Sequence, residues 1–294
     1  MRWPEAEVEL DLALVRELLR EQHADLAGRP LRYVDAGFDN SLWRLGDDLL
    51  VKLPRRLIAA NLAEKEPRWL PHLAPGLPLA IPAPVRTGRP SGRYPWPWSI
   101  VPWLEGEPGD RAAVTKPLDA GCRLGRFLRA LHREAPTSAP FNPWRSVALR
   151  ERTGTFEDRL AALQAHLDAR GLRQIWKAAL EADPHRDPAV WIHGDPHPAN
   201  VLLSEGTVVA VLDFGDLCEA DPATDLGGAL LLLPANGLEA LKVEYPGVDD
   251  HLLRRSLAWG ALFGLMLLEL AQQDRPSYEE MARVGLERVL AHRP

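Results

Sequence analysis

The chain has 294 residues, of which 46% are hydrophobic and 26% charged, so it can bury one large core or two of ordinary size. Its formal net charge of −6 argues against nucleic acid as the main partner, because a phosphate polymer is usually met by a basic face. A small and cationic partner fits that charge better. The two cysteines, Cys122 and Cys218, form no CxxC pair, which excludes a disulfide framework and a zinc knuckle and suits a reducing cytoplasm.

The N-terminal residues lack the basic start, apolar core and small-residue cleavage site of a signal peptide. The longest apolar stretch, residues 257–271, contains Glu269 and is too short to span a bilayer. We therefore expect a buried helix there, a cytoplasmic protein and no membrane contact.

The first third of the chain reads as a mixture of helix and strand. Apolar residues at helical spacing predict an amphipathic helix over residues 6–26. Residues 31–54 alternate or run apolar in short pieces separated by turns, which predicts strands, and a helical piece follows at 58–73. The proline-rich residues 75–98 cannot be helical and are expected to wrap a sheet edge, before "WSIVPWLEGEPG" forms a last strand and turn.

The rest of the chain reads as mostly helical, with stripes at residues 157–181, 251–272 and 277–291. The exception is the middle, where "WIHG", "NVLLS" and "TVVAVLDFG" predict short strands around polar loops. Strands early and helices late predict a smaller α+β lobe, a hinge near residues 102–106 and a larger helical lobe.

The stretch "WIHGDPHPANVLL" places polar side chains between two apolar segments. One interpretation is a metal-dependent hydrolase in which His193, Asp195, His197 and Asp213 bind the metal. Prolines interrupt this loop, however, so its two histidines are not stacked on a helix face as in an HExxH arrangement.

A second interpretation explains the spacing of Asp195, Asn200 and Asp213, the last of which opens "DFG". Kinase-like enzymes use D-x-x-x-x-N followed by D-F-G to place one base and two magnesium ligands around a transferring phosphoryl group. Mg²⁺ prefers a few hard oxygen ligands, which an Asn amide and an Asp carboxylate supply. The other carboxylate then stays available to accept a hydroxyl proton.

"HGDPHPAN" followed by "VLDFGD" resembles the aminoglycoside phosphotransferase family of small-molecule kinases. "VDAGFDNSLWRLGDDLLVKLPRR", "SIVPWLEGEP" and "DPATDL" stand in the family's order, so the resemblance covers most of the chain. It implies an α+β, protein-kinase-like bilobal fold. Residues 1–104 would form a small, sheet-containing, nucleotide-binding N-lobe. Residues 105–294 would form a larger, mainly helical C-lobe with the catalytic loop and the metal and substrate sites.

The resemblance also implies roles for the polar loops. Asp195 would be the catalytic base that orients and deprotonates the acceptor hydroxyl, and Asn200 and Asp213 would be the magnesium ligands. His193 would brace the backbone of the loop, and a structural role is also expected for His197.

On the nucleotide side, the resemblance implies that Lys52 of "LLVKLP" reaches the α and β phosphates of ATP. Its expected partner is Glu66 on the next helix, with Glu64 as the alternative. Pro67 departs from the usual pattern, because proline is comfortable only in the first turn of a helix. The helix is therefore expected to start late or to kink here.

The turn "DAGFDNS" has a single glycine, so a side chain, Ser41 or Asn40, is expected to help cradle phosphate. In the family a hinge carbonyl and a backbone N–H two residues further on read the adenine. Here the Pro102 carbonyl and the Leu104 N–H would do so. Because only backbone groups are involved, GTP is an alternative to ATP.

The other acidic residues near the polar loops are not expected to take part in catalysis. Asp225 in "DPATDL" is expected to begin or cap a helix and to brace the catalytic loop. Four others could meet ammonium groups of a substrate or could be surface charges: Asp216, Glu219, Glu269 and Asp274.

These observations predict an ATP- and Mg²⁺-dependent O-phosphotransferase that moves the γ-phosphate to a hydroxyl of a small molecule, with an aminoglycoside as the expected acceptor. Macrolides, choline, homoserine and sugars are alternative acceptors. A nucleotide-binding pseudokinase is a third hypothesis beside the hydrolase, and the complete set of Lys52, Asp195, Asn200 and Asp213 speaks against it.

Overall fold

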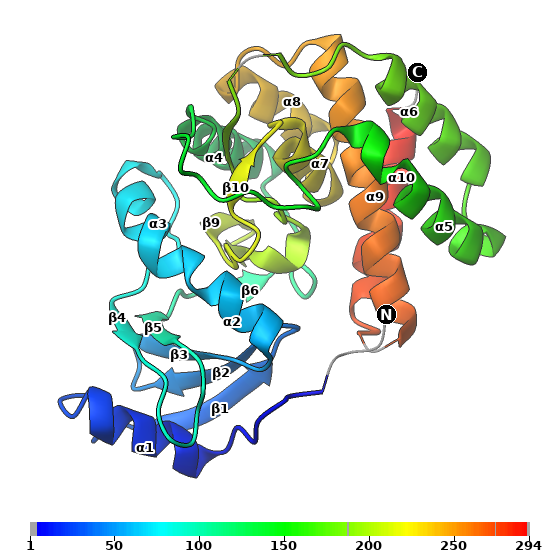
Figure 1. The fold of residues 1–294 in the computed structure, drawn as a ribbon. Coiled ribbons are helices and arrows are strands. Elements are labelled where there is room, and N and C mark those ends of the chain that lie inside the picture. The colour runs from blue at the N-terminus through cyan, green and yellow to red at the C-terminus, as the bar shows by residue number, and fades with distance from the viewer. Residues whose placement is uncertain (1–4, 187, 274, 293–294) are drawn as a thin grey trace. The chain divides into compact units, whose positions relative to one another are not determined.

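The computed structural model describes residues 5–186, 188–273 and 275–292 (Figure 1). The chain divides into two compact units. Of the described residues, the N-terminal unit comprises 5–75 together with Ala80–Glu105, and the C-terminal unit comprises Gly76–Leu79 and those from Gly106 onward. The nucleotide and catalytic roles predicted for the two halves of the chain stay predictions at this point.

The N-terminal unit is built on one antiparallel sheet in the order β1-β2-β3-β5-β4. Its strands are β1 (Leu31–Ala36), β2 (Asn40–Leu45), β3 (Leu49–Pro54), β4 (Arg86–Gly88) and β5 (Trp98–Pro102). The proline-rich segment supplies the edge strand β4, as expected, because proline has no N–H to donate to a central ladder.

The opening helix is shorter than predicted. Helix α1 spans Leu12–Gln22, and it begins there because the Asp11 side chain caps it by accepting a hydrogen bond from the Leu14 N–H at 2.7 Å. Its buried side chains join a core with apolar residues of the sheet, among them Trp43 and Ile100.

The helical piece predicted at 58–73 is two helices, α2 (Leu57–Ala63) and α3 (Lys65–Leu73). Pro67 explains the break at Glu64. Proline is tolerated in the first turn of a helix, where its missing N–H has no helical acceptor to lose, and a new helix that begins at Lys65 places Pro67 in that turn. A short 3-10 helix, η1 (Ala74–Gly76), follows.

The C-terminal unit is mainly helical. Its helices are α4 (Pro117–Leu131), α5 (Thr153–Leu163), α6 (Ala169–Glu181), α7 (Ala223–Leu232), α8 (Ala235–Glu244), α9 (Asp250–Gln273) and α10 (Tyr278–Ala291). Helix α9 packs against α5, α6, α7 and α10 and carries the buried run predicted at 257–271. Among the described residues, no helix combines the length and apolarity needed to cross a bilayer.

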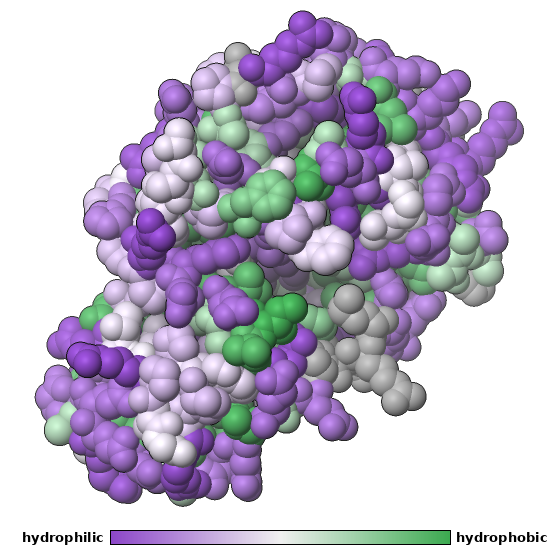
Figure 2. Space-filling model, viewed as in Figure 1, coloured by the Kyte–Doolittle hydropathy of each residue, from purple (hydrophilic) through white to green (hydrophobic). Residues whose placement is uncertain are grey.

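Two small sheets of the C-terminal unit position its polar loops. Strand β7 (Val190–Ile192) pairs with β10 (Cys218–Ala220), and β8 (Val201–Ser204) lies between β6 (Glu107–Pro108) and β9 (Thr207–Val211). The loop at 193–200 therefore joins β7 to β8, and the loop at 212–217 joins β9 to β10. The face in Figure 2 is mostly hydrophilic with scattered apolar patches, as expected once the apolar side chains are collected inside.

Candidate functional site

The loop at 193–200 is held at its start by Asp225. This residue is fully buried in the first turn of α7, and its carboxylate accepts hydrogen bonds from the backbone N–H groups of His193 (2.7 Å) and Gly194 (2.9 Å). The His132 Nε2 lies 3.0 Å from the same carboxylate. Asp225 therefore braces the loop, as expected, but from within the helix rather than as its cap.

The electrostatics of Asp225 favour its ionised form. Burial alone would raise the pKa of this carboxyl, but the hydrogen bond and charge of His132, the charge of His193 and the Gly194 N–H outweigh burial and lower the pKa. The carboxylate thus satisfies buried donors that would otherwise lack a partner.

We expect Asp225→Asn to destabilise the protein by about 2–3 kcal/mol, because hydrogen bonds to a charged group are worth about 1.5–3 kcal/mol each and an amide replaces them only in part. Thermal unfolding followed by circular dichroism measures the change. Asp250→Asn is the matched control, since its pair with Arg254 is exposed on α9 and should contribute less than about 1 kcal/mol. Equal melting temperatures for the two variants would contradict the bracing role.

His193 links the two polar loops through the backbone. Its ring is buried, with Nε2 2.7 Å from the Leu212 carbonyl and Nδ1 3.1 Å from the Asp195 N–H. The amide must donate to Nδ1, so Nε2 carries the proton and donates to the carbonyl. Both ring nitrogens are therefore occupied, which removes His193 from the ligand set of the metal-dependent hydrolase. Within the described part of the chain, no group of three or more His, Cys, Asp or Glu side chains is arranged to hold a metal.

Asp195 presents its carboxylate at the turn of the loop. The Arg145 Nη2 lies 3.5 Å from Oδ1 and the His197 Nε2 lies 3.5 Å from Oδ2, while Oδ1 is sealed from solvent and accepts no hydrogen bond from the described residues. Burial raises the pKa of Asp195 to about 7, against the opposing charge of Arg145 and with the support of the nearby Asp216 carboxylate.

Asn200 is oriented by the loop itself. Its Nδ2 donates to the backbone carbonyl of Asp195 at 2.9 Å and lies 3.3 Å from the His197 Nε2. The two ends of an amide are distinguished by their partners, so this bond leaves Oδ1 as the atom available to a cation. The Asn200 carbonyl also accepts from the Leu212 N–H at 2.8 Å, which joins this loop to the next.

His197 is buried and uncharged at neutral pH, because burial lowers its pKa to about 4. Its ring meets Tyr278 edge-on with 6.0 Å between the centroids. This environment is that of a packed side chain in contact with Asp195 and Asn200, in agreement with the structural role expected for it.

Asp213 has a left-handed backbone, with φ of 60°, and an exposed side chain. Such a conformation costs energy for most residues and is concentrated at functional sites. Its carboxylate accepts a long hydrogen bond, 3.4 Å from the Gly215 N–H to Oδ1. A hard carboxylate oxygen that is exposed in this way, together with the Asn200 Oδ1, fits the donor set that Mg²⁺ prefers.

In the N-terminal unit, Lys52 and Glu66 form a buried ion pair. The Lys52 Nζ lies 2.8 and 2.7 Å from the two carboxylate oxygens, and the residues are 8% and 4% exposed. Glu66 rather than Glu64 is therefore the partner of the lysine. Pro67 does not prevent the pairing, because the helix begins just before it and places Glu66 in the first turn, where a negative charge is favourable.

The other N-terminal residues have less direct placements. Ser41 is buried in β2, and its hydroxyl accepts a hydrogen bond from the indole of Trp43 at 2.8 Å, so this oxygen is already in use. Pro102 ends β5 opposite Leu49, and Leu104 follows two residues later, beyond the ladder. Their roles in nucleotide binding stay predictions.

Sequence reasoning missed Arg145, which connects the two polar loops of the C-terminal unit. This buried residue donates from Nε to the Gly194 carbonyl and from Nη2 to Oδ2 of Asp216 at 3.1 Å. Asn142 donates to the other oxygen of Asp216 at 2.8 Å. Arg145 lies in an irregular segment without any motif, so no local signal could have identified it.

The acidic residues considered for substrate ammonium groups are largely occupied. Both oxygens of Asp216 are bonded as described above, and Glu269 pairs with Arg159 at 2.9 Å. Asp274 lies outside the described residues. Glu219 is half-buried in β10, and the exposed carboxylate of Asp213 adds negative charge near Asp195.

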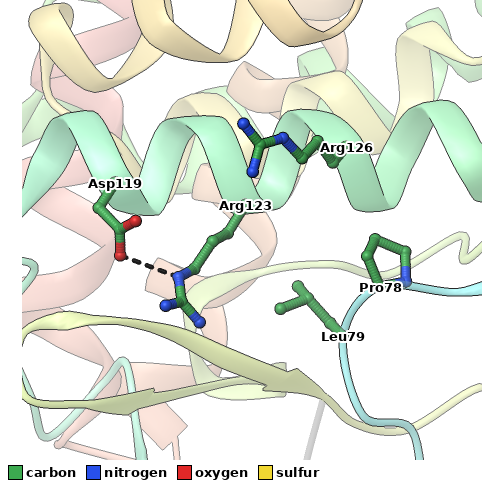
Figure 3. A pocket seen from close by; sticks show the side chains of 5 residues that line it. All are labelled: Pro78, Leu79, Asp119, Arg123 and Arg126. Atoms are coloured by element: carbon green, nitrogen blue, oxygen red, sulfur yellow. Dashed lines mark hydrogen bonds and ion pairs between the residues drawn. The ribbon is translucent and has the colours of Figure 1, made fainter.

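A separate hollow lies along α4, lined by Pro78, Leu79, Asp119, Arg123 and Arg126 (Figure 3). Arg123 donates to the Asp119 carboxylate at 2.9 Å, as the dashed line in the figure shows. None of the residues predicted for the active site lines this hollow.

Comparison with known proteins agrees with the geometry. The sequence pattern of the phosphotransferase enzyme family matches residues 30–280. A 106-residue segment is 29% identical to an aminoglycoside 3'-phosphotransferase from Escherichia coli, and this match spans 35% of the chain and only 39% of that relative.

Solved structures share the fold over nearly the whole chain. The GDP complex of wild-type aminoglycoside 2'-phosphotransferase-IIIa has a TM-score of 0.69 at 19% identity, with 96% of this chain and 99% of that one covered. Macrolide 2'-phosphotransferase MphH from Brachybacterium faecium has a TM-score of 0.63 at 24% identity, with 94% and 97% covered. These likenesses confirm the predicted α+β, protein-kinase-like fold. Because the family pattern matches well over half of its residues, the chain belongs to the phosphotransferase enzyme family.

Proposed function

We propose that this protein is a Mg²⁺-dependent kinase that moves the γ-phosphate of ATP to a hydroxyl group of a small molecule. The observation that carries the proposal is the catalytic loop. The Asp195 carboxylate is partly exposed, with 23% of its side chain accessible, and Asn200 donates from Nδ2 to the loop backbone, which leaves its amide oxygen available. A substrate hydroxyl would donate to the exposed side of this carboxylate.

Asp195 would accept the proton of the acceptor hydroxyl as that oxygen attacks the phosphorus in line. A pKa of about 7 suits a group that must take up a proton near neutral pH. Arg145, held by Gly194 and Asp216, would fix the direction of the carboxylate. Most of the rate enhancement would then come from positioning and charge rather than from covalent chemistry.

Asn200 and Asp213 would hold Mg²⁺, since one offers an amide oxygen and the other an exposed carboxylate. When bound, the ion would neutralise the charge on the nucleotide phosphates. The left-handed backbone at Asp213 would keep its side chain in place before the ion arrives.

In the N-terminal unit, Lys52 would contact the α and β phosphates, with Glu66 holding its ammonium in position. The Pro102 carbonyl and the Leu104 N–H would read the base. One structure of the same fold is named as a complex with GDP, and another as a ternary complex with streptomycin and ATP. These names support nucleotide binding and leave ATP and GTP as alternatives.

The acceptor predicted from the sequence is an aminoglycoside. The names of the curated relative and of several structural neighbours support that class, whereas other neighbours are named as macrolide phosphotransferases. Both classes carry hydroxyl groups, so both belong in the first set of acceptors to be tried.

The decisive experiment measures ADP formation from ATP and Mg²⁺ with a panel of aminoglycosides, macrolides and hydroxylated metabolites. We expect at least one acceptor to stimulate ADP formation in the wild type and none to do so in Asp195→Ala. If no acceptor stimulates ADP formation in the wild type, or if both proteins respond equally, the proposal is wrong.

Lys52→Met should lower kcat/KM for ATP by about 10- to 100-fold, because a charge-assisted contact to phosphate is worth about 1.5–3 kcal/mol. The variant also leaves the buried Glu66 unpaired, so Lys52→Arg is measured beside it to retain the charge. Lys177→Met, on an exposed lysine of α6, is the control and should leave kcat/KM unchanged. A folded Lys52→Met enzyme with wild-type kcat/KM would exclude the phosphate contact.

A further inference from the structure

Arg152 is a buried arginine without a counter-ion. It ends the 3-10 helix η2 (Leu149–Arg152) directly before α5, and only 8% of its surface is exposed. Within the described residues it makes no hydrogen bond and no ion pair, and its Nε is sealed from solvent without a partner. Its guanidinium does stack on the ring of Trp144, at 5.1 Å from Cζ to the centroid.

The surroundings of Arg152 add positive rather than negative charge. Burial lowers the pKa of its guanidinium, and the charges of Arg145 and Arg159 lower it further. Two carboxylates of this unit already have partners. Asp216 accepts from Arg145 and Asn142, and Glu269 pairs with Arg159. Three guanidinium groups therefore act on one another, and of the three only Arg152 has no acidic partner among the described residues.

Such an arrangement is unfavourable for folding alone. A buried charge is normally paired, and an apolar side chain of similar volume usually fills the same space at lower free energy. A guanidinium does, however, match the planar oxygen pairs of carboxylate and phosphate with its fork of donors. An anion bound at Arg152 would supply the missing counter-charge.

We propose that Arg152 binds an anionic group, a carboxylate or a phosphate, carried by the acceptor substrate. This inference rests on the proposed phosphotransferase function. Arg145 connects the two places, because it directly follows Trp144, on whose ring Arg152 lies, and its Nη2 is 3.5 Å from Oδ1 of Asp195. The acceptor would then be a hydroxyl compound with a negative charge, bordered by the exposed ring of Trp144. A cationic group of an acceptor would be repelled by Arg152.

Anion binding is tested first without any acceptor. Inorganic phosphate and, in parallel, succinate are titrated calorimetrically at constant ionic strength into the Lys52→Met protein, so that phosphate binding to the nucleotide-contacting lysine does not contribute. We expect one of the two anions to bind, and Arg152→Met in the same background to weaken its binding by about 10-fold or more. Arg173→Met is the matched control, because its partner Glu157 is exposed, and it should bind like the parent.

Either of two binding results would overturn this assignment. Either neither anion binds the parent protein, or Arg152→Met binds as tightly as the Arg173→Met control. Melting temperatures separate binding from folding. Without anions, Arg152→Met should melt at the same temperature as the parent or a few degrees above it, since a buried charge has been removed. A large decrease would show instead that Arg152 is structural.

The acceptor assignment has its own readout in the wild-type enzyme. With an acceptor from the panel above, the anion that binds at Arg152 should inhibit competitively against the acceptor, and Arg152→Met should raise KM for the acceptor more than it changes KM for ATP. Inhibition competitive only with ATP would refute the acceptor assignment. If no acceptor is phosphorylated, the kinase proposal fails, whereas the calorimetric result still decides whether Arg152 binds anions.

Discussion

Asp195→Ala is expected to lower kcat by about 10²- to 10⁴-fold, the range attributed to a positioned general base, while the affinity for nucleotide stays within about twofold. The contacts that hold the loop at this residue use backbone atoms. The Asp195 N–H donates to the ring of His193, and the Asp195 carbonyl accepts from Asn200. Alanine keeps both bonds, so the substitution removes the carboxylate and leaves the loop in place.

Single-turnover phosphoryl transfer and the binding of a fluorescent nucleotide measure the two quantities separately. Asp250→Ala is the matched control, because that carboxylate is exposed on α9, and its kcat should equal that of the wild type. Turnover of Asp195→Ala within tenfold of the wild type would mean that another group accepts the proton. A parallel loss of nucleotide affinity would point instead to collapse of the loop.

The parts of the fold that were predictable depend on local patterns. Alternating apolar residues and turn signals marked β1 to β3, and the prolines before β5 marked the edge of the sheet. The errors lie at element ends. The opening helix begins after a capping side chain, Asp11, several residues after its apolar pattern begins. The pattern over residues 58–73 is continuous, but a second helix begins at Lys65, because Pro67 is tolerated only in a first turn.

Two kinds of site residue could be predicted from the sequence. Asp195 and Asn200 have a fixed spacing within one segment, and Lys52 lies in a segment with the pattern of a strand. Their supports come from distant segments. Arg145 precedes the loop it contacts by about fifty residues of chain, in an irregular segment without a recognisable motif. Contacts of this kind arise only when the helices of the C-terminal unit pack, so composition and periodicity carry no sign of them.

The net charge of the chain carries less information about the substrate than the placement of individual charges does. A net charge of −6 suggested a cationic partner, but that sum does not say where the charges lie. Asp216 and Glu269 are satisfied by Asn142 and arginines and Asp213 keeps an exposed carboxylate, whereas Arg152 is left with no acidic partner among the described residues. The total charge therefore does not reveal that unpaired charges of both signs lie in this unit.

Asp213→Asn is the second substitution with a large expected effect, a fall in kcat of about 10²- to 10³-fold, since a metal-bound phosphate is worth several kcal/mol of the barrier. Asparagine is chosen because it adopts the left-handed backbone at this position, φ of 60°, more readily than alanine does. The substitution therefore removes one negative charge and leaves the turn intact.

The Mg²⁺ concentration that gives half-maximal nucleotide binding should increase at least tenfold in Asp213→Asn, because a neutral amide holds the ion less tightly than a carboxylate. Nucleotide binding without Mg²⁺ should not weaken, since the removed charge only repels phosphate. Glu205→Asn is the matched control: it places the same side chain at the other described non-glycine position with positive φ, 49°, in the exposed turn between β8 and β9. A wild-type Mg²⁺ dependence in Asp213→Asn would remove this residue from the metal site, because the substitution keeps the size of the side chain and removes its charge.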